Sequence, residues 1–273
     1  MTVAEAIRAA AGRMTGSDTA RLDAELLMAH ALGMSRSDML VRAMREDAPE
    51  GYEALIERRL DHEPIAYIVG WQEFYGRDFA VAPGVLIPRG DSETLVDAAL
   101  ELAPQAERVL DLGTGSGALL VTALLELDRA HGIGIDASPT AVAIAEANAQ
   151  AHGLIGARAR FLERSWHDDG WAHDLGRFDL VLCNPPYVEE DAPLEPQVRD
   201  HEPAEALFAG AEGLDDYRAL IPQLGKLLSP DGIAIFEIGH TQVEAVEAIG
   251  ASHGFVTQMR RDLAKRPRAI VLS

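Results

Sequence analysis

Residues 108–117, with the sequence RVLDLGTGSG, decide the fold, because a strand-like apolar segment runs directly into a loop with three glycines. Gly113, Gly115 and Gly117 allow the backbone to turn tightly and to approach a ligand closely. Residues 117–129 then have the apolar composition of a buried helix. In doubly wound sheets this order of strand, loop and helix forms a ligand site at the carboxyl end of the strand.

The chain beyond Pro104 continues the same alternation to its end. Apolar strands that alternate with helices predict a mostly parallel, seven-stranded sheet covered on both faces, which is a doubly wound α/β fold. Only KRP separates the last two strands, which allows a terminal hairpin and one antiparallel strand at the end of the sheet. We expect strands at 108–113, 132–136, 157–163, 179–183, 232–238, 257–264 and 268–273, and helices at 117–129, 139–152, 215–228 and 241–253.

Residues 1–64 have helical apolar spacing throughout and predict a bundle of three or four short helices. One helix is expected between Asp18 as its cap and Gly33 as its stop, the next starts at Ser35, and another begins near Pro49. A bundle this small is too small for a catalytic domain. It is interpreted as a substrate-docking domain, with a purely stabilising appendage as the alternative.

Residues 65–84 mix β-branched and aromatic side chains with glycines, which predicts a β-hairpin linker. The remaining residues, 85–273, form the main domain. Its first helix is expected over 91–103, with Asp91 or Ser92 as the N-cap.

The glycine loop is compatible with two ligands. Gly113, Gly115 and Ala118 fit the looser dinucleotide pattern, and Asp136 lies where an acidic residue binds a ribose hydroxyl. A nicotinamide dinucleotide and S-adenosylmethionine both carry that ribose. Asp111 favours the second ligand, because a carboxylate beside the loop suits the ammonium group of a bound amino acid better than a pyrophosphate.

The motif NPPY, residues 184–187, follows the fourth expected strand, at the same edge as the glycine loop. Pro185 and Pro186 stiffen the backbone and leave carbonyl groups as acceptors. Asn184 adds a side-chain acceptor, and Tyr187 offers a flat face. Two fixed acceptors can hold both N–H bonds of a planar –NH₂ group and orient its nitrogen for methylation. The alternative is a simple turn that ends the strand.

The composition limits the possible partners and environment of the chain. It has 273 residues, a formal net charge of −20 and one cysteine, Cys183, which is expected in the core. The acidic charge argues against a nucleic-acid substrate without excluding one. The chain has no signal-peptide pattern and no apolar stretch long enough for a membrane span, so a cytoplasmic location is expected.

The chain resembles a known family over nearly its whole length. DLGTGSG (111–117), GIGID (132–136) and NPPY resemble class I S-adenosylmethionine-dependent methyltransferases that modify planar –NH₂ nitrogens. Four other stretches are similar to the peptide chain release factor glutamine methyltransferases, the PrmC/HemK family. They are LLMAHALGMSRSDML (26–40), RRLDHEPIAYIVGWQEFYG (58–76), LIPRGDSETLV (86–96) and HEPAEALFAGAEGLDDYRAL (201–220).

The resemblance implies a Rossmann-like methyltransferase domain behind a helical domain and a hairpin linker. It implies transfer of a methyl group from S-adenosylmethionine to the glutamine amide in the Gly-Gly-Gln loop of class I release factors, with S-adenosylhomocysteine as the product. A monomer is expected, although the sequence does not fix the oligomeric state. The implied cofactor residues are Asp111, Gly113, Thr114, Gly115, Ser116, Gly117, Asp136, Trp166 and Asn184, and the implied glutamine site is Asn184, Pro185, Pro186 and Tyr187, of which Asn184, Pro185 and Tyr187 are catalytic.

One segment departs from the family pattern Pro-Arg-Pro-(Glu/Asp)-Thr-Glu. Gly90 replaces the second proline and Ser92 replaces the threonine, whereas Arg89, Asp91 and Glu93 remain. Arg89 and Glu93 are therefore secondary site candidates. A helix cap for Ser92 and a favourable charge on the helix dipole for Glu93 are the alternatives.

Two further functions stay open. A methyltransferase for an exocyclic amine of a nucleic-acid base is one, but residues 189–216 contain ten acidic residues and only Arg199 as a base. Such a segment would repel phosphates and attract a basic protein partner. A non-catalytic adaptor that binds S-adenosylmethionine is the other. The histidines show no ligand spacing, so no metal site is expected.

Overall fold

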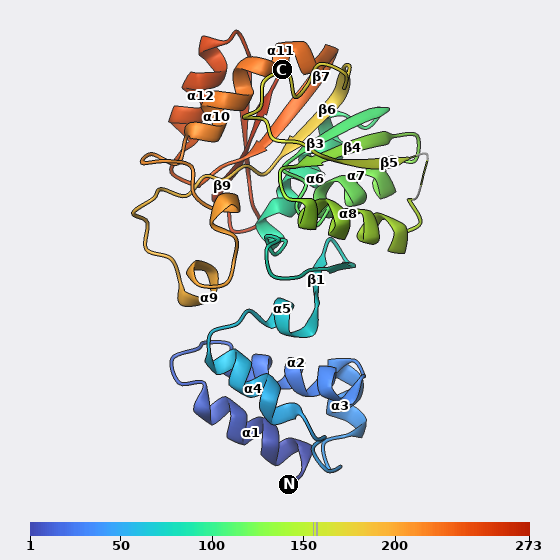
Figure 1. The fold of residues 1–273 in the computed structure, drawn as a ribbon, viewed down its shortest axis with the longest axis vertical. Helices are drawn as coiled ribbons and strands as arrows, with labels where there is room; N and C mark the ends of the chain where they lie inside the picture. The colour runs from blue at the N-terminus through green and yellow to red at the C-terminus, as the bar shows by residue number, and fades with distance from the viewer. Residues whose placement is uncertain (155, 157) are drawn as a thin grey trace. The chain divides into compact units, whose positions relative to one another are not determined.

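The computed structural model describes residues 1–154, 156 and 158–273, and the chain divides into two compact units (Figure 1). The first comprises Met1–Trp71 together with Leu194–His201. The second comprises Gln72–Pro193 and Glu202–Ser273. Among the described helices, none is both long enough and apolar enough to cross a membrane.

The first unit is helical, as its apolar spacing predicts. Thr2 and Glu5 form a capping box at the start of the first helix, and Ser35 caps the third, as expected. Gly33 ends the second helix with a φ of 65°. Asp18 is not its cap: Thr19 holds that position, one residue nearer the helix. The helices of this unit are α1 (Val3–Arg13), α2 (Ala20–Leu32), α3 (Arg36–Arg42), α4 (Tyr52–Leu60), α5 (Ile65–Val69) and the short α9 (Pro196–Arg199).

The hairpin is shorter than expected, because its first five residues form the helix α5. Pro64 stands before this helix and Gly70, with a φ of 86°, ends it. The side chains of α5 are mostly buried, so packing overrides the strand preference of its β-branched residues. The hairpin itself comprises β1 (Trp71–Phe74) and β2 (Arg77–Ala80).

The second unit contains a seven-stranded sheet in the order β5-β4-β3-β6-β7-β9-β8, which confirms the predicted α/β fold. All pairings are parallel except those of β9 with β7 and β8. The antiparallel strand is therefore second from the edge and not at the end of the sheet. The strands are β3 (Arg108–Leu112), β4 (His131–Asp136), β5 (Ala159–Glu163), β6 (Phe178–Cys183), β7 (Leu228–Glu237), β8 (Thr257–Arg261) and β9 (Pro267–Leu272).

The composition of the last two strands explains their order. The sequence PRAIVL of β9 is almost wholly buried, which suits an inner position between two neighbours. The sequence TQMRR of β8 is half-buried to exposed along its length. Charged side chains on an edge strand also discourage pairing with another chain.

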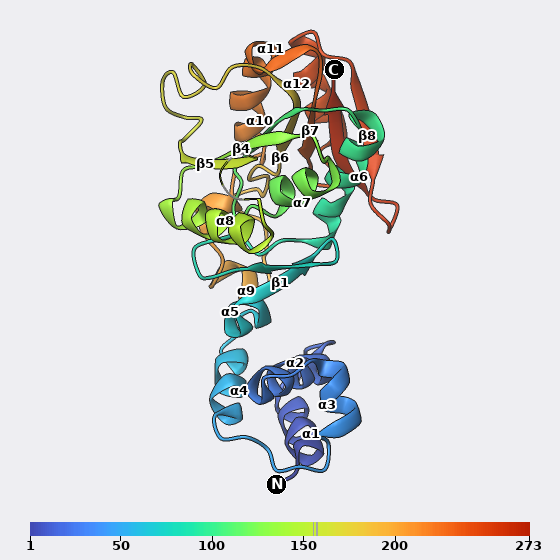
Figure 2. The same ribbon diagram turned by 90° about the vertical axis from the view of Figure 1, so that its right-hand side faces the viewer.

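Helices cover both faces of the sheet (Figures 1 and 2). Side chains alternate between the two cores along each strand, so that Val109 contributes to one core and Leu110 to the other. One face carries α6 (Glu93–Leu102), α7 (Ala118–Glu126) and α8 (Pro139–Ala151). The other carries α10 (Asp215–Leu220), the 3₁₀ turn η3 (Ile221–Gln223), α11 (Leu224–Leu227) and α12 (Val243–Ser252).

Three expectations for the second unit need correction. The helix expected over 215–228 is broken at η3, which contains Pro222, because proline cannot continue the helical hydrogen bonds. The strand expected at 232–238 begins earlier, at Leu228, which pairs with Phe178. The strand expected from Ala157 begins at Ala159, and Ala157 itself lies outside the described residues.

A buried ion pair in the first unit provides a test of its folding. The Arg59 Nε donates to Asp23 Oδ2 at 2.8 Å, and Asp23 is only 5% exposed. Arg59→Met leaves this carboxylate buried without its partner, and we expect the free energy of unfolding to fall by about 3 kcal/mol. Urea unfolding with hydrogen exchange of the α2 and α4 amides measures the loss in this unit. Arg21→Ala is the matched control, because Arg21 is exposed and its partner Glu25 keeps Arg36. Equal losses for both variants would contradict this assignment.

Candidate active site

The carboxyl ends of β3, β4 and β6 border a cavity of about 740 Å³ in the second unit. Its walls come from the loops after these strands and after β5, from the segment that precedes α6, and from a segment before α10. Its lining includes Arg89, Ser92, Gly113, Thr114, Gly115, Ser116, Asp136, Trp166, His167, Asn184, Pro186, Glu205 and Asp216.

The glycine loop is fixed from behind by backbone hydrogen bonds. The N–H groups of Gly113 and Thr114 both donate to the carbonyl oxygen of Ile135, at 3.0 and 2.9 Å. Gly113 has a φ of 72°, and a Cβ there would lie 3.2 Å from the Trp166 ring. A glycine is therefore required both for the turn and for the packing of the indole against the loop.

Gly117 ends the loop as the N-cap of α7, with a φ of 81°. A Cβ at this position would lie 3.1 Å from Ala145 of α8. The Asn148 side chain, also on α8, donates to the carbonyl oxygens of Ser116 and Ala80. One amide thus ties the glycine loop to the hairpin strand β2.

Asp111 lies completely buried beneath the loop. Its Oδ2 accepts a hydrogen bond from the Thr114 hydroxyl at 2.6 Å, and its Oδ1 has no partner among the described residues. Burial raises the pKa of Asp111 to about 7, although the Thr114 hydroxyl acts in the opposite direction. Thr114 lines the cavity and Asp111 is not part of its lining, so Asp111 is connected to the cavity through the Thr114 hydroxyl.

Asp136 closes β4 and lines the cavity. Its Oδ2 accepts from the N–H of Gly115 at 2.8 Å, and its Oδ1 accepts from the N–H of Ser138 at 2.9 Å. Burial raises the pKa of this carboxyl group, and the two N–H groups oppose that rise. Each oxygen keeps acceptor capacity for a ligand hydroxyl.

Trp166 also lines the cavity. Its Nε1 donates to Asp216 Oδ1 at 2.7 Å, and the Nε2 of His167 lies 3.2 Å from the same oxygen. Burial raises the pKa of Asp216, which the Trp166 hydrogen bond opposes. These contacts hold the indole ring beside the glycine loop.

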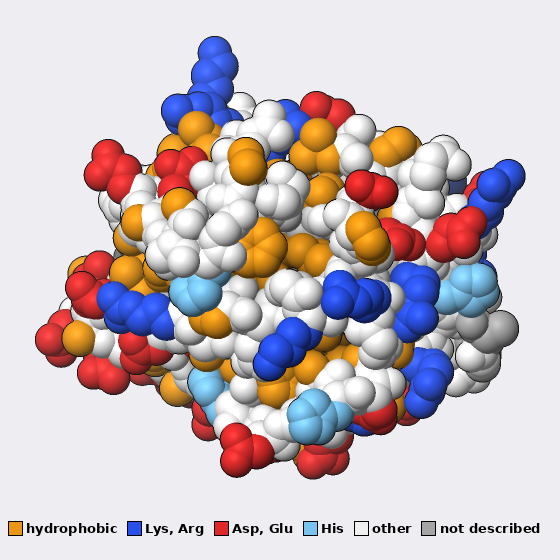
Figure 3. Space-filling view, turned by 90° about the horizontal axis from the view of Figure 1, so that it is seen from above, with side chains coloured by type: hydrophobic (Ala, Val, Ile, Leu, Met, Phe, Trp, Pro, Cys, Tyr) orange, Lys and Arg blue, Asp and Glu red, His pale blue; other side chains and the backbone are white. Residues whose placement is uncertain are grey.

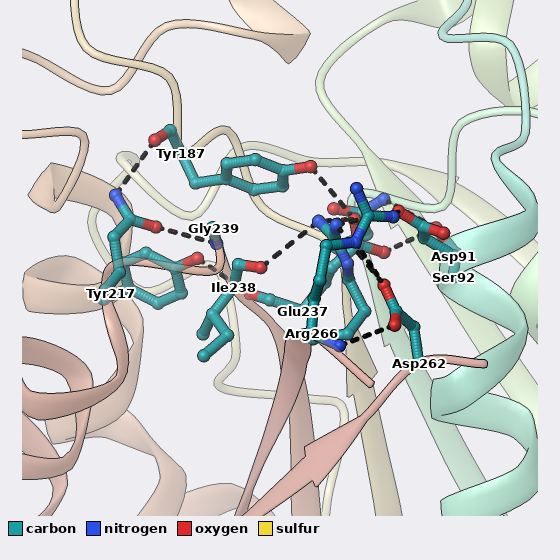
Figure 4. A network of polar contacts seen from close by, with 12 residues as sticks. Asp91, Ser92, Tyr187, Tyr217, Glu237, Ile238, Gly239, Asp262 and Arg266 are labelled. Atoms are coloured by element: carbon teal, nitrogen blue, oxygen red, sulfur yellow. Dashed lines mark hydrogen bonds and ion pairs between the residues drawn. The ribbon is translucent and has the colours of Figure 1, made fainter. Parts of the chain in front are cut away.

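The NPPY motif contributes unequally to the cavity. Asn184 and Pro186 line it, and Pro185 is buried. Tyr187 is half-buried, and its hydroxyl donates to Glu237 Oε1 at 3.1 Å (Figure 4). Cys183, directly before the motif, is buried, which confirms it as a core residue.

Ser92 was expected as a helix cap, but its side chain makes no capping hydrogen bond. Its hydroxyl instead donates to Glu237 Oε2 at 2.5 Å and accepts from Asn184 Nδ2 at 3.3 Å. Asp91 makes ion pairs with Arg266 and Arg268, at 2.9 and 2.7 Å. Both cap candidates are thus engaged in side-chain contacts away from the first turn of α6.

The two secondary candidates lie in different places. Arg89 lines the cavity and makes an ion pair with the buried Glu202 at 2.5 Å. Glu93 instead accepts a hydrogen bond from the N–H of Tyr75, a residue whose φ of 53° forms the hairpin turn. Glu93 therefore holds the hairpin and does not face the cavity.

The sequence reasoning missed His167, Glu205, Asp216 and Glu237. Glu237 had a detectable signal, since it is the single charged residue at the end of the apolar strand GIAIFEI. His167 lies in a loop, Glu205 in the 3₁₀ turn η2 (Ala204–Ala206) and Asp216 in α10, and no local sequence pattern indicates that these segments face the cavity. Among the residues that the structure describes, no group of three or more His, Cys, Asp or Glu side chains is arranged to hold a metal ion.

The lining fits S-adenosylmethionine in size and charge. A cavity of about 740 Å³ is in the range of small-molecule and cofactor sites. Asp136, Glu205 and Asp216 line it, and Arg89 is paired with Glu202, so its potential favours a cation. Asp111, whose Oδ1 has no hydrogen-bond partner among the described residues, adds a negative charge beneath the loop when it is ionised.

Comparisons with known proteins agree with this geometry. Residues 5–70 match a family described as PrmC N-terminal domain, and residues 104–256 match a methyltransferase domain. A release factor glutamine methyltransferase of Geobacter sulfurreducens is 41% identical over 247 residues, which cover 88% of this chain and 84% of the relative. One of Caulobacter vibrioides is 38% identical over 284 residues, which cover 99% and 96%.

Among solved structures, the ribosomal protein L11 methylase of Lactobacillus delbrueckii subsp. bulgaricus has a TM-score of 0.50 at 24% identity. The match covers 68% of this chain and 79% of that chain, and it shows the fold alone. The two matched domains, together with relatives that span nearly the whole chain, show the family. The chain belongs to the family of release factor glutamine methyltransferases, enzymes that use S-adenosylmethionine as the methyl donor.

Proposed function

We propose that this enzyme methylates the side-chain amide nitrogen of the glutamine in the Gly-Gly-Gln loop of class I release factors. The observation that carries the proposal is one shared cavity, which has the Asn184 amide at the end of β6 and the Asp136 carboxylate at the end of β4. An amide acceptor beside a ribose site brings the two substrates together.

The cofactor would lie along the glycine loop. Residues 113–117 would hold its methionine part, with Thr114 and the charge of Asp111 favouring the ammonium group. Asp136 would accept the ribose hydroxyls, since both its oxygens are already oriented by backbone N–H groups. Trp166 would lie beside the adenine. When bound, S-adenosylmethionine supplies an electrophilic methyl group on its sulfonium sulfur.

The NPPY motif would bind the glutamine. Asn184 Oδ1 and the backbone carbonyl of Pro185 would accept the two N–H bonds of the substrate amide, while Pro186 and Tyr187 hold the backbone in place. The amide nitrogen is a weak nucleophile because its lone pair is delocalised. The two acceptors orient it and stabilise the positive charge that develops on it. The proton leaves after the transfer, so no strong base is needed.

The helical first unit would dock the release factor, and the enzyme would act as a monomer in the cytoplasm, where translation factors are found. The match of residues 5–70 to a domain named for this family supports a role tied to the family's substrate.

A nucleic-acid substrate is less compatible with the charges of the described residues. The acidic segment Glu189–Asp191 is exposed after the motif. Figure 3 shows the end of the sheet where β9 finishes, opposite the cavity, and the Lys and Arg side chains that lie together in this view are therefore away from the site. Phosphate backbones need clustered Lys and Arg contacts.

The deciding experiment is incubation with methyl-labelled S-adenosylmethionine and purified release factor. Label is expected on the release factor and absent from a variant in which the Gly-Gly-Gln glutamine is replaced. Label on RNA or DNA but not on the factor would refute the proposal. Cofactor binding without any transfer would support an adaptor.

Removal of the Asn184 amide tests its role. Asn184→Ala is expected to lower kcat for transfer by about 100-fold or more, because an acceptor for the developing charge is lost. Calorimetry with S-adenosylhomocysteine should show that most of the cofactor affinity is kept. Circular dichroism is the control, and loss of folding would return Asn184 to a structural role.

The buried Asp111 predicts a pH dependence of cofactor binding. Its pKa of about 7 lies above the ordinary value of 3.8, so its charge, and the attraction for an ammonium group, appear as the pH rises through about 7. S-adenosylhomocysteine should bind about 3- to 10-fold more tightly at about pH 8 than at about pH 6. The same ionisation lowers folding stability over this range, so binding is measured well below the melting temperature. Asp111→Asn should abolish the dependence, and an unchanged profile would contradict it.

The exposed acids after the motif predict electrostatic steering of the release factor. Replacing Glu189, Glu190 and Asp191 by lysine should lower kcat/KM and flatten its salt dependence, with kcat unchanged. The matched control carries the same charge change at exposed acids elsewhere in the unit, namely Asp128, Asp231 and Glu244. If both triple variants respond alike, the segment has no steering role.

A further inference from the structure

Glu237 is a buried carboxylate that is linked by hydrogen bonds to both ends of the NPPY motif. It is 1% exposed at the end of β7. Its Oε1 accepts from the Tyr187 hydroxyl, and its Oε2 accepts from the Ser92 hydroxyl (Figure 4). Ser92 in turn is bonded to Asn184 Nδ2. One side chain therefore reaches Tyr187 directly and Asn184 through a single hydroxyl.

The number of available protons fixes which group donates in each hydrogen bond between Asn184, Ser92 and Glu237. A carboxylate has only acceptors, and a serine hydroxyl has one proton. The Ser92 proton is committed to Glu237, so the Ser92 oxygen can only accept a hydrogen bond from Asn184. Asn184 must then present its –NH₂ group to Ser92, which leaves Oδ1 as the free end of the amide.

We propose that Ser92 and Glu237 are positioning residues that fix the amide orientation of Asn184, so that its Oδ1 remains available to accept an N–H bond of the substrate. The inference rests on the proposed function, in which Asn184 is that acceptor. An amide rotated by half a turn would present –NH₂ to the substrate –NH₂ and would lose the hydrogen bond.

The local structure supports a role for Ser92 beyond the start of a helix. It is only 3% exposed and lies directly before α6, where a serine ordinarily caps the first turn. No capping hydrogen bond is made. The hydroxyl is directed instead at two residues that are distant in sequence, and the N-cap position is left without its usual side-chain acceptor.

The surroundings of Glu237 bear on its charge. Burial raises the pKa of Glu237, and Asp91 acts in the same direction. The Ser92 and Tyr187 hydroxyls and Arg268, whose Nη1 lies 4.0 Å from Oε1, favour the charged form. Arg268 is itself held by Asp91 and lies 3.9 Å from Asp262. The arginine is thus oriented by acidic neighbours toward the carboxylate that must stay an acceptor.

The first test is kinetic. Ser92→Ala should lower kcat for release-factor methylation about 10-fold, the equivalent of one oriented hydrogen bond, with most of the affinity for S-adenosylhomocysteine kept. The buried Glu237 also loses a donor, so the melting temperature should fall, and rates are compared well below it. Ser92→Thr keeps the hydroxyl and should restore most of the rate. Ser229→Ala is the matched control, because this hydroxyl on β7 bonds to Phe178 and Asp179 at the opposite end of β6. A kcat for Ser92→Ala equal to that of the control would overturn the proposal.

Glu237→Gln tests the acceptor without changing the shape of the side chain. The Tyr187 hydroxyl and Arg268 both face the Oε1 side and draw the new amide oxygen there. The new –NH₂ group then faces Ser92, which must donate its proton to Asn184 and so reverse that amide. We expect kcat to fall at least as far as in Ser92→Ala, and a rate equal to wild type would contradict the role of Glu237.

A double-mutant cycle separates positioning from general destabilisation. If Ser92 acts only through Asn184, then Ser92→Ala should cause no further loss of kcat in an Asn184→Ala background. A loss of the same size in both backgrounds would show that Ser92 acts independently of Asn184 and would refute the proposal.

Nuclear magnetic resonance of the Asn184 side-chain amide needs no catalysis. Its signal, identified by its absence in Asn184→Ala, should move in Ser92→Ala and Glu237→Gln but not in Ser229→Ala. A signal unmoved by Ser92→Ala would overturn the inference. If the wild-type enzyme transferred no methyl group to the release factor, the proposed function would fall, whereas this spectrum would still decide whether Ser92 holds the amide.

Discussion

The site depends on one constraint, which is the common register of four parallel strands. Leu112 pairs with Ile135 and with Cys183, and Cys183 pairs with Phe236. These residues form a row across β4, β3, β6 and β7. The next residue on each strand is Asp136, Gly113, Asn184 or Glu237, so the four polar or turning positions lie side by side at one edge. A slip of one residue in any strand would turn its side chains to the other face and remove its residue from the row.

The row also explains how much of the site could be predicted from sequence. Each member follows an apolar strand, and parallel strands place such positions at one edge, so Gly113, Asp136 and Asn184 were predicted together. Glu237 obeys the same rule, but it stands next to no recognisable motif. Ser92 was out of reach, because it lies 145 residues from Glu237 in the chain. Contacts between residues so far apart arise from tertiary packing, which leaves no periodic signal.

For the fold as well, features with local causes could be predicted from the sequence and features with long-range causes could not. The strands and helices of the second unit were predictable because their apolar residues repeat at regular intervals. The helix α5 was missed because burial overrode the strand preference of its residues, and the inner position of β9 became evident only when its neighbours were known. Pro222 marked the break after α10, but the preceding and following apolar spacing suggested one continuous helix.

Burial of carboxylates at this edge connects the architecture to the chemistry. Asp111, Asp136, Asp216 and Glu237 all have their pKa raised by burial, which means that the charged forms are costly to hold there. Such costs are tolerated in sites that must present charge to a ligand without rearrangement. The first three favour a cationic cofactor. Glu237 does not line the cofactor cavity. The cost of burying its charge is explained if Glu237 keeps the side-chain amide of Asn184 oriented.

An orientation fixed in this way also determines which substrates the site can accept. Asn184 Oδ1 and a backbone carbonyl are both acceptors, so they match a group that offers two N–H bonds. A carboxylate of the same shape as the glutamine amide would place oxygen against oxygen, with no proton between them. A buried site rejects such a partner strongly, because its polar groups are left unpaired. In the proposed site, selectivity for glutamine over glutamate would come from the fixed directions of the hydrogen bonds from Glu237 through Ser92 to Asn184, without a positively charged residue.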